Sequence, residues 1–201
     1  MRIIGLTGQS GAGKGTVASL FAEHGIPTVD ADAVYHTLLI PPSPCLDELR
    51  TAFTDAILNA DGTLNRPALA ALVFAGTHEA KNRLHRLNEI THRYVAEKIL
   101  ATMDDYAELG HKAAVIDAPL LIEAGLHHRC DCVIAVLADR EIRIERLIQR
   151  DNLSAEQISA RLDAQPDVSF YLEHADMVVF NNGTLQELKS AVSSCLSEVL
   201  A

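Results

Sequence analysis

A glycine-rich segment near the N-terminus holds the first residues whose types and spacing suit chemistry. Residues 8–14 (GQSGAGK) fit the pattern G-x-x-x-x-G-K, in which main-chain N–H groups surround phosphate oxygens and a lysine adds positive charge. Residues 2–7 form an apolar run typical of a buried strand, and residues 14–24 have the apolar spacing of a helix, whose N-terminus attracts anions. The segment therefore predicts a site for nucleotide phosphates. Its expected binding residues are Gly11, Ala12, Gly13, Lys14, Gly15 and Thr16.

One position of this segment departs from the usual pattern. Gly15 stands where such loops usually place a serine or threonine that contacts magnesium, and Thr16 follows it. Thr16 is therefore the candidate hydroxyl ligand for Mg²⁺ in this loop. The alternative is a glycine-rich turn that only joins a strand to a helix, but the strand, the helix and Lys14 together favour the nucleotide site.

Acidic residues follow two further predicted strands. Asp30 and Asp32 come after the strand expected at residues 26–29, and Asp117 ends the strand expected at 113–117. Because open α/β sheets bind ligands beyond the carboxyl ends of their strands, we expect these carboxylates at the same crevice as the phosphate loop. Asp32, in preference to Asp30, is the candidate base for an attacking hydroxyl, and Asp117 is a candidate Mg²⁺ ligand. The competing roles are helix caps for the first two and a turn or cap for Asp117.

Four arginines lie close together in an otherwise acidic chain. Arg143, Arg146 and Arg150 fall on one face of a helix expected at about residues 140–150, and Arg140 lies at its start. An arginine row near a phosphate loop stabilises negative charge on a phosphoryl group during transfer, and we expect this role of Arg146 and Arg150. The alternative is a solvated face whose arginines pair with neighbouring carboxylates.

Apolar runs alternate with helical segments and must position these residues. Strands are expected at 2–7, 26–29, 113–117, 132–137 and 177–180, which implies an α/β fold with a parallel sheet covered on both faces. We expect one domain, with a core of about residues 1–32 and 111–201 and an inserted helical subdomain at about 33–110. Residues 151–167, with a capping box at 154–157 and with Arg161, are expected to form a lid that excludes water.

The composition limits what the chain can bind. Its 201 residues carry a formal net charge of −10, which argues against broad adhesion to nucleic acid or anionic membranes. No apolar run approaches the roughly 20 residues that cross a bilayer, and the first apolar run breaks at a glycine, so we expect a cytoplasmic protein. The four cysteines give no disulfide framework, and residues 127–132 (HHRCDC) lack a second ligand pair at zinc spacing.

These motifs together resemble the dephospho-coenzyme A kinase family over nearly the whole chain. They are LTGQSGAGKGT at residues 6–16, DAD at 30–32, D-x-P-L-L-x-E at 117–123, R-x-x-x-R-D at 146–151, AQ at 164–165, and AD followed by N-x-G within 175–183. The loop alone indicates only nucleotide binding, whereas D-x-P-L-L-x-E together with DAD is much more specific. The chain departs at Gly15, where the family usually has serine, and at residues 90–93 (ITHR), where it usually has His-Pro.

The resemblance implies ATP-dependent phosphorylation of the ribose 3′-hydroxyl of dephospho-coenzyme A, with Mg²⁺, on the five-stranded P-loop kinase fold. It implies Asp32 as the catalytic base, Lys14 and Arg146 as charge stabilisers, and a helical subdomain that holds this small-molecule acceptor. The candidate substrate-binding residues are Asp32, His92, Arg150 and Arg161, and the candidate metal ligands are Thr16 and Asp117.

Two other functions fit the phosphate loop. The variant GKGT occurs in adenylate-kinase-like enzymes, which phosphorylate nucleoside monophosphates, but the rest of the chain follows the dephospho-coenzyme A kinase pattern. A nucleotide-binding switch without kinase turnover is the second, although the segment N-K-x-D that usually specifies guanine is absent from the sequence. The sequence gives no indication of the oligomeric state.

Overall fold

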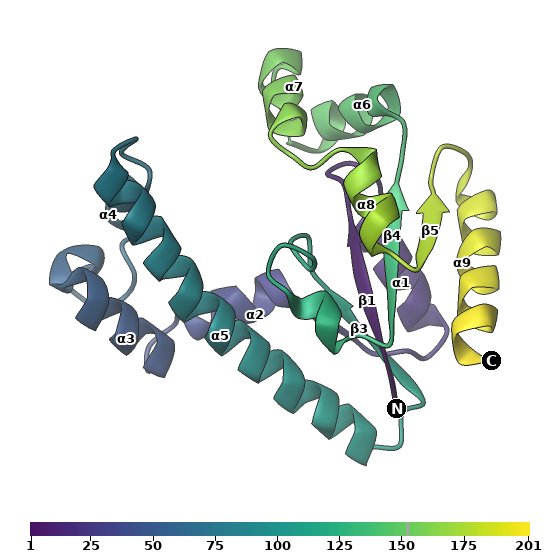
Figure 1. Ribbon diagram of the computed structural model, residues 1–201, viewed down its shortest axis with the longest axis horizontal. Helices are drawn as coiled ribbons and strands as arrows, with labels where there is room; N and C mark the ends of the chain where they lie inside the picture. Colours follow the sequence, from purple (N-terminus) through teal and green to yellow (C-terminus); the bar gives the residue numbers. More distant parts are fainter. Residues whose placement is uncertain (152) are drawn as a thin grey trace. The chain divides into compact units, whose positions relative to one another are not determined.

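A five-stranded parallel sheet is the scaffold of the fold. Figure 1 shows the computed structural model, which describes residues 1–151 and 153–201. The strands are β1 (Arg2–Gly8), β2 (Thr28–Asp30), β3 (Ala113–Asp117), β4 (Cys132–Leu137) and β5 (Met177–Phe180), in the order β2-β3-β1-β4-β5. Leu6 of β1 lies opposite Asp117 on one side and opposite Ile134 on the other. The expected α/β fold is confirmed, and the chain leaves β1 between the carboxyl ends of β3 and β4.

Helices cover both faces of this sheet, as the side chains of β4 show. Ile134 points into a core that includes residues of α1 (Lys14–Glu23) and α9 (Leu185–Leu200). Its neighbour Ala135 points to the opposite face and packs with a buried cluster that includes α8 (Val168–His174). Because successive side chains of a strand alternate between the two faces, a strand covered on both sides is apolar throughout. This explains the continuous apolar run CVIAVL.

Two helices between β4 and α8 carry several of the predicted site residues. α6 (Arg140–Asp151) and α7 (Ala155–Asp163) pack through a small apolar cluster of their own. The capping box predicted for α7 is confirmed, because the main-chain N–H of Gln157 donates to the Ser154 hydroxyl at 3.3 Å and the Gln157 side chain accepts from the Ser154 N–H at 3.0 Å. A short 3₁₀ helix, η2 (Leu126–Arg129), precedes β4.

The chain forms two compact units. The first comprises Met1–Val29 with Met103–Ala201, and the second comprises Asp30–Thr102. The second unit contains α2 (Ala31–Leu38), α3 (Pro44–Phe53), η1 (Asp55–Ile57), α4 (Arg66–Val73) and most of α5 (His78–Glu108). The helical stretch expected at about 33–110 falls mostly within this second unit, and its expected role in holding an acceptor remains a prediction.

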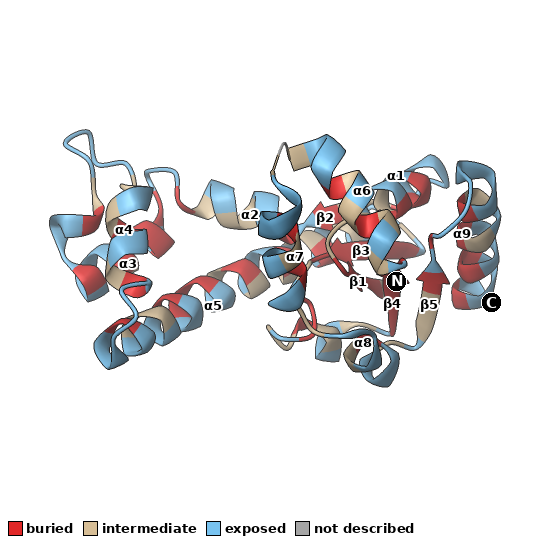
Figure 2. Cartoon of the chain, turned by 90° about the horizontal axis from the view of Figure 1, so that it is seen from above, coloured by how far each residue is buried: buried red, intermediate tan, exposed pale blue. Residues whose placement is uncertain are grey.

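The second unit has an apolar core of its own, in which Leu49, Ile57 and Ile90 are buried. Figure 2 shows buried and exposed residues alternating along α5 with the spacing of an amphipathic helix. The helix runs without a break through residues 90–93, because Arg93, unlike a proline, keeps its main-chain N–H. Although α5 has 31 residues, neither it nor any other helix within residues 1–151 and 153–201 has a stretch long and apolar enough to cross a membrane.

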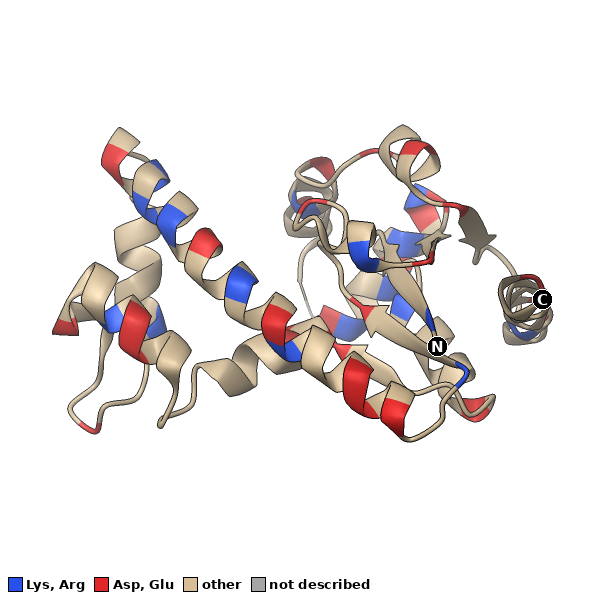
Figure 3. Cartoon of the chain, turned by 60° about the horizontal axis from the view of Figure 1, so that its bottom comes forward, with Lys and Arg blue, Asp and Glu red and all other residues tan. Residues whose placement is uncertain are grey.

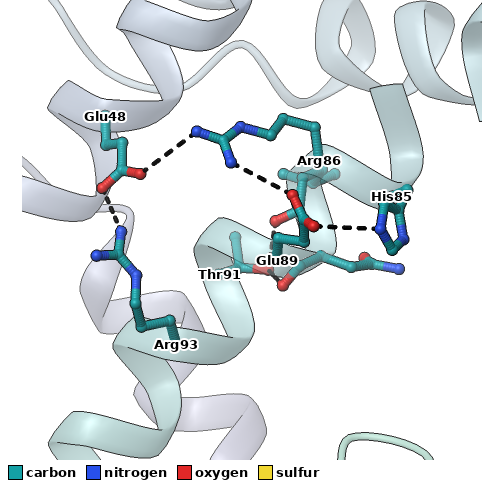
Figure 4. A network of polar contacts seen from close by, with 8 residues as sticks. Glu48, His85, Arg86, Glu89, Thr91 and Arg93 are labelled. Carbon is teal, nitrogen blue, oxygen red and sulfur yellow. Dashed lines mark hydrogen bonds and ion pairs between the residues drawn. The ribbon is translucent and has the colours of Figure 1, made fainter. Parts of the chain in front are cut away.

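Charged side chains join α5 to α3 within the second unit. Basic and acidic residues are interspersed along α5 (Figure 3). Glu48 of α3 accepts hydrogen bonds from Arg93 and, at 3.1 Å, from the hydroxyl of Tyr94, while Arg86 lies 3.9 Å away; Figure 4 shows the two arginines on either side of this carboxylate. Burial raises the pKa of Glu48, but these hydrogen bonds outweigh it and hold the pKa below its ordinary value. Glu48 is therefore ionised at neutral pH.

Candidate active site

The phosphate loop has a main-chain shape that only glycine accommodates at its tightest points. Gly13, the residue before α1, has a φ of 98°, and a Cβ atom there would lie 2.3 Å from Nδ2 of Asn181. At Gly8 a Cβ atom would lie 2.3 Å from the carbonyl oxygen of Val136 in β4. Both distances are far below van der Waals contact. The loop is therefore held closely between β4 and the residues after β5, with its N–H groups at the start of a helix, as a phosphate site requires.

Lys14 and Asp117 meet at the mouth of this loop. The Lys14 ammonium donates a hydrogen bond to Oδ1 of Asp117, whose residue is only 7% exposed. The loop after Asp117 is fixed to β1, since the hydroxyl of Thr7 donates to the carbonyl of Pro119 at 3.1 Å. The structure thus brings together the predicted phosphate-binding lysine and the predicted metal-binding carboxylate, which lie 103 residues apart in the chain.

Arg146 contacts the main chain of the loop. Its Nη1 donates to the carbonyls of Gly11 and Ala12 at 3.4 Å each, and its Nη2 donates to the carbonyl of Asn181 at 3.0 Å. Buried Asn181 completes the arrangement, because its Nδ2 donates to the Ala12 carbonyl at 2.8 Å. In this geometry Arg146 fixes the loop, in addition to placing a positive charge beside it. Asn181 was not among the predicted site residues, although it is the asparagine of the N-x-G motif and directly follows the last strand.

A second contact secures the other side of the loop. The main-chain N–H of Ser10 donates to Oε1 of Gln165, and Nε2 of Gln165 donates back to the Ser10 hydroxyl, both at 3.1 Å. Gln165 belongs to the segment expected as a lid, of which residue 152 lies outside the described residues. The carboxyl end of that segment therefore rests on the phosphate loop.

The three arginines predicted on one face of α6 differ in how far they are buried. Arg143 is buried, Arg146 is half-buried and Arg150 is exposed. Arg150 pairs with Asp151, and so does Arg161 of α7 at 2.9 Å. The hydrogen bond from Arg150 is the main reason that the pKa of Asp151 lies below its ordinary value. For Arg150 the structure shows an ion pair, which was the alternative considered for the arginines of this helix, and the expected contact of Arg150 and Arg161 with substrate remains a prediction.

Asp30 and Asp32 belong to the second unit and differ in their surroundings. Strand β2 ends at Asp30, whose Oδ1 accepts from the N–H groups of Asp32 at 2.8 Å and Ala33 at 3.1 Å. Asp30 is therefore the N-cap of α2, which was one of the two roles considered for it. Asp32 lies in the first turn of α2, and its exposed carboxylate makes no hydrogen bond or ion pair with the residues that the structure describes. In the same unit, partial burial of the imidazole lowers the pKa of His92 below its ordinary value.

The oxygen groups near the loop fit a magnesium ion. Mg²⁺ in nucleotide sites is usually held by one or two protein oxygens together with substrate phosphates and water. Asp117 offers a carboxylate at the loop, and Thr16 offers an exposed hydroxyl in the first turn of α1. Among residues 1–151 and 153–201 there is no cluster of three His, Cys, Asp or Glu side chains that could hold a metal by itself. The donor set therefore suits a metal shared with a nucleotide.

Comparison with known sequences identifies the family to which this chain belongs. The sequence profile of the dephospho-CoA kinase family matches residues 2–187. A dephospho-CoA kinase from Corynebacterium glutamicum is 40% identical over 198 residues, which is 98% of this chain and 97% of the relative. The chain belongs to the dephospho-CoA kinase family. Another dephospho-CoA kinase, from Anaeromyxobacter dehalogenans, is 40% identical over 99% of this chain and 92% of its own length.

Solved structures agree with membership of the dephospho-CoA kinase family. The dephospho-CoA kinase from Campylobacter jejuni superimposes with a TM-score of 0.71 at 27% identity, covering 99% of this chain and 98% of its own. A protein from Thermus thermophilus has a TM-score of 0.80 at 34% identity, covering 98% and 97%. Shikimate kinase from Acinetobacter baumannii, at 14% identity and a TM-score of 0.53 over 100% of this chain and 93% of its own, shares the fold alone.

Proposed function

We propose that this protein transfers the γ-phosphoryl group of ATP to the ribose 3′-hydroxyl of dephospho-coenzyme A, giving coenzyme A and ADP. The observation that carries the proposal is a phosphate loop with Lys14 held against Asp117, in a member of the dephospho-CoA kinase family. A nucleoside-monophosphate kinase would share the loop, but the family match extends over residues 2–187 rather than over the loop alone. The proposed partners are small molecules in the cytoplasm.

The first unit supplies the residues for the donor. Main-chain N–H groups of residues 11–16 bind the phosphates, and the Lys14 ammonium moves from Asp117 to the β- and γ-phosphate oxygens. Arg146 keeps the loop in position and adds a positive charge beside the phosphoryl group in transfer. Asp117 and Thr16 would hold Mg²⁺, which when bound neutralises part of the phosphate charge.

The second unit contains the proposed base, Asp32, and we propose that its helices help to hold the acceptor. The Asp32 carboxylate accepts the proton of the 3′-hydroxyl while that oxygen forms its bond to the γ-phosphorus and the bond to the ADP oxygen breaks. A carboxylate without an internal partner in the described part of the chain is suited to this role, whereas Asp30 is already occupied as a helix cap. The proposed contacts of the acceptor are His92 of the second unit and Arg150 and Arg161 of the first.

An acceptor panel tests the proposal. Purified protein receives ATP and Mg²⁺ with dephospho-coenzyme A, AMP, CMP or no acceptor, and ADP formation is followed in each case. We expect turnover with dephospho-coenzyme A and only background with the other three. Turnover with a monophosphate but not with dephospho-coenzyme A would assign the protein to the nucleoside-monophosphate kinases, and ATP binding without any turnover would indicate a nucleotide switch.

A further inference from the structure

The arginines of α6 differ in what their guanidinium groups contact. Arg140 and Arg150 form ion pairs with aspartates, and Arg146 donates to carbonyl oxygens of the phosphate loop. Arg143 is the exception. Its Nε and Nη1 atoms are closed off from solvent, yet neither has a hydrogen-bond partner within residues 1–151 and 153–201.

An arginine in this condition destabilises the fold that contains it. Arg143 is only 5% exposed. Burial, followed by the nearby charge of Arg140, lowers its pKa, but a guanidinium stays protonated at neutral pH. Burying a charge without compensating hydrogen bonds costs several kcal/mol, and an unsatisfied buried group in a native protein calls for an explanation such as a functional role, strain or a bound water or ion. Because its buried guanidinium does not stabilise the fold, we look for a role of Arg143 in binding.

The surroundings of Arg143 indicate what it binds. Its main chain packs directly on the phosphate loop, since a Cβ atom at Gly11 would lie 2.8 Å from the Arg143 carbonyl oxygen and 3.1 Å from its Cα. Its side chain lies near Tyr171 of α8. Burial and the charge of Glu123 raise the pKa of Tyr171 to about 12, and the positive charge of Arg143 acts in the opposite direction. Arg140 also lies close by, although its own charge is paired with Asp163. A planar guanidinium beside a second cation selects an anion, and phosphate oxygens suit it best.

We propose that Arg143 is a further phosphate-binding residue of this kinase, which donates to a phosphoryl oxygen of a bound nucleotide next to the phosphate loop. Two nucleotides carry phosphoryl oxygens that could accept this hydrogen bond: ATP through its triphosphate, and dephospho-coenzyme A through its 5′-diphosphate. Only the second source rests on the proposed function. Reaching the buried nitrogen atoms requires a small opening between α6 and α8, both of which belong to the first unit.

The test compares stability with ligand binding in the full-length protein. Arg143→Met removes the charge and keeps an unbranched apolar chain, and Arg143→Gln provides a second variant in case the first folds poorly. Arg83→Met removes an exposed arginine of α5, whose ion pair is with Glu79, and controls for the change in net charge. Thermal unfolding is recorded for each protein. Affinities for MgATP, inorganic pyrophosphate and dephospho-coenzyme A are measured separately by calorimetric titration.

We expect Arg143→Met to unfold at the same or a higher temperature than the wild type, because an apolar replacement of a buried charge is often neutral or stabilising. We expect its affinity for at least one nucleotide to fall about tenfold or more, since a hydrogen bond to a charged group contributes about 1.5–3 kcal/mol. A loss for MgATP and pyrophosphate assigns Arg143 to the donor, and a loss for dephospho-coenzyme A alone assigns it to the acceptor.

The opposite pattern overturns the proposal. If both Arg143 variants unfold at lower temperature and bind all three ligands as tightly as the wild type, Arg143 has a structural role only. Failure of the proposed function is a separate result. In that case the wild type binds nucleotides without phosphorylating dephospho-coenzyme A, and the MgATP and pyrophosphate titrations still decide the role of Arg143.

Discussion

At the scale of the residue, Asp30 and Asp32 lie two positions apart but have different surroundings. Asp30 uses its carboxylate to cap α2, whereas Asp32 in the first turn of that helix keeps its carboxylate exposed. We predict that Asp32→Asn lowers kcat about 10²-fold or more and leaves ATP affinity nearly unchanged, because it removes the base but no phosphate contact. Steady-state kinetics and ATP titration measure the two effects.

Asp30→Asn is the matched control for this prediction. Asparagine caps a helix about as well as aspartate, so both thermal stability and kcat should stay close to those of the wild type. If Asp30→Asn abolishes turnover while Asp32→Asn has a mild effect, the base is Asp30 and the proposed assignment is wrong.

Gly15 supports a prediction about the metal. A Cβ atom there would meet no atom within 4 Å beyond its chain neighbours and the backbone of its own helix, so Gly15→Ser should fold normally and add a hydroxyl beside the phosphate site. We expect it to lower severalfold the Mg²⁺ concentration needed for half-maximal turnover. Gly15→Ala also gains helix propensity, about 0.5–1 kcal/mol in unfolding free energy, but adds no hydroxyl. Identical magnesium titrations of the two variants would show that Thr16 or water already fills this role.

At the scale of the element, α6 acts on the loop through the forked guanidinium of Arg146. It joins Gly11 and Ala12 to Asn181, the residue after β5. Arg146→Lys keeps the charge but cannot hold both segments, so we predict that ATP binds about tenfold more weakly, the equivalent of losing about 1.4 kcal/mol of binding free energy. An unchanged ATP affinity with a large fall in kcat would mean that Arg146 acts on the phosphoryl group and not through the loop.

The packing of α3 on α5 gives a prediction about pH. The pKa of Glu48 is lowered in the folded protein, so its stabilising effect is present above the ordinary glutamate pKa and is lost as the pH falls through the lowered value. Glu48→Gln should therefore destabilise the protein at neutral pH, and the difference from the wild type should vanish in acid. Urea unfolding at a series of pH values tests this, with exposed Glu145→Gln as the control. A difference independent of pH would exclude the charge of Glu48 as its cause.

At the scale of the whole molecule, the sheet and the phosphate loop could be predicted because their signals are local. An apolar strand, a glycine turn and a helix follow one another within residues 2–23, and the alternation of strands and helices specified a parallel sheet. The capping box of α7 was equally local. The short helix α8 was missed, because its seven residues offer too few turns for a periodic pattern.

Contacts between distant residues could not be predicted in the same way. The hydrogen bonds of Ser10 with Gln165 and of Ala12 with Asn181 join residues more than 150 positions apart. Helical spacing placed Arg143 and Arg150 on one face, but only the packing of α6 on the loop shows that the first is buried and the second exposed. Spacing fixes direction around a helix, whereas burial depends on what the tertiary fold places against it.

The central claim is that the 3′-hydroxyl of dephospho-coenzyme A receives the phosphoryl group, and the position of the new phosphate tests it most directly. The protein is incubated with ATP, Mg²⁺ and either dephospho-coenzyme A or its 3′-deoxy analogue, and the products are examined by phosphorus NMR. The account predicts a single 3′-phosphomonoester from the first acceptor and no phosphorylated product from the second. Phosphorylation of the 3′-deoxy analogue, or a phosphate at another position of dephospho-coenzyme A, would contradict it.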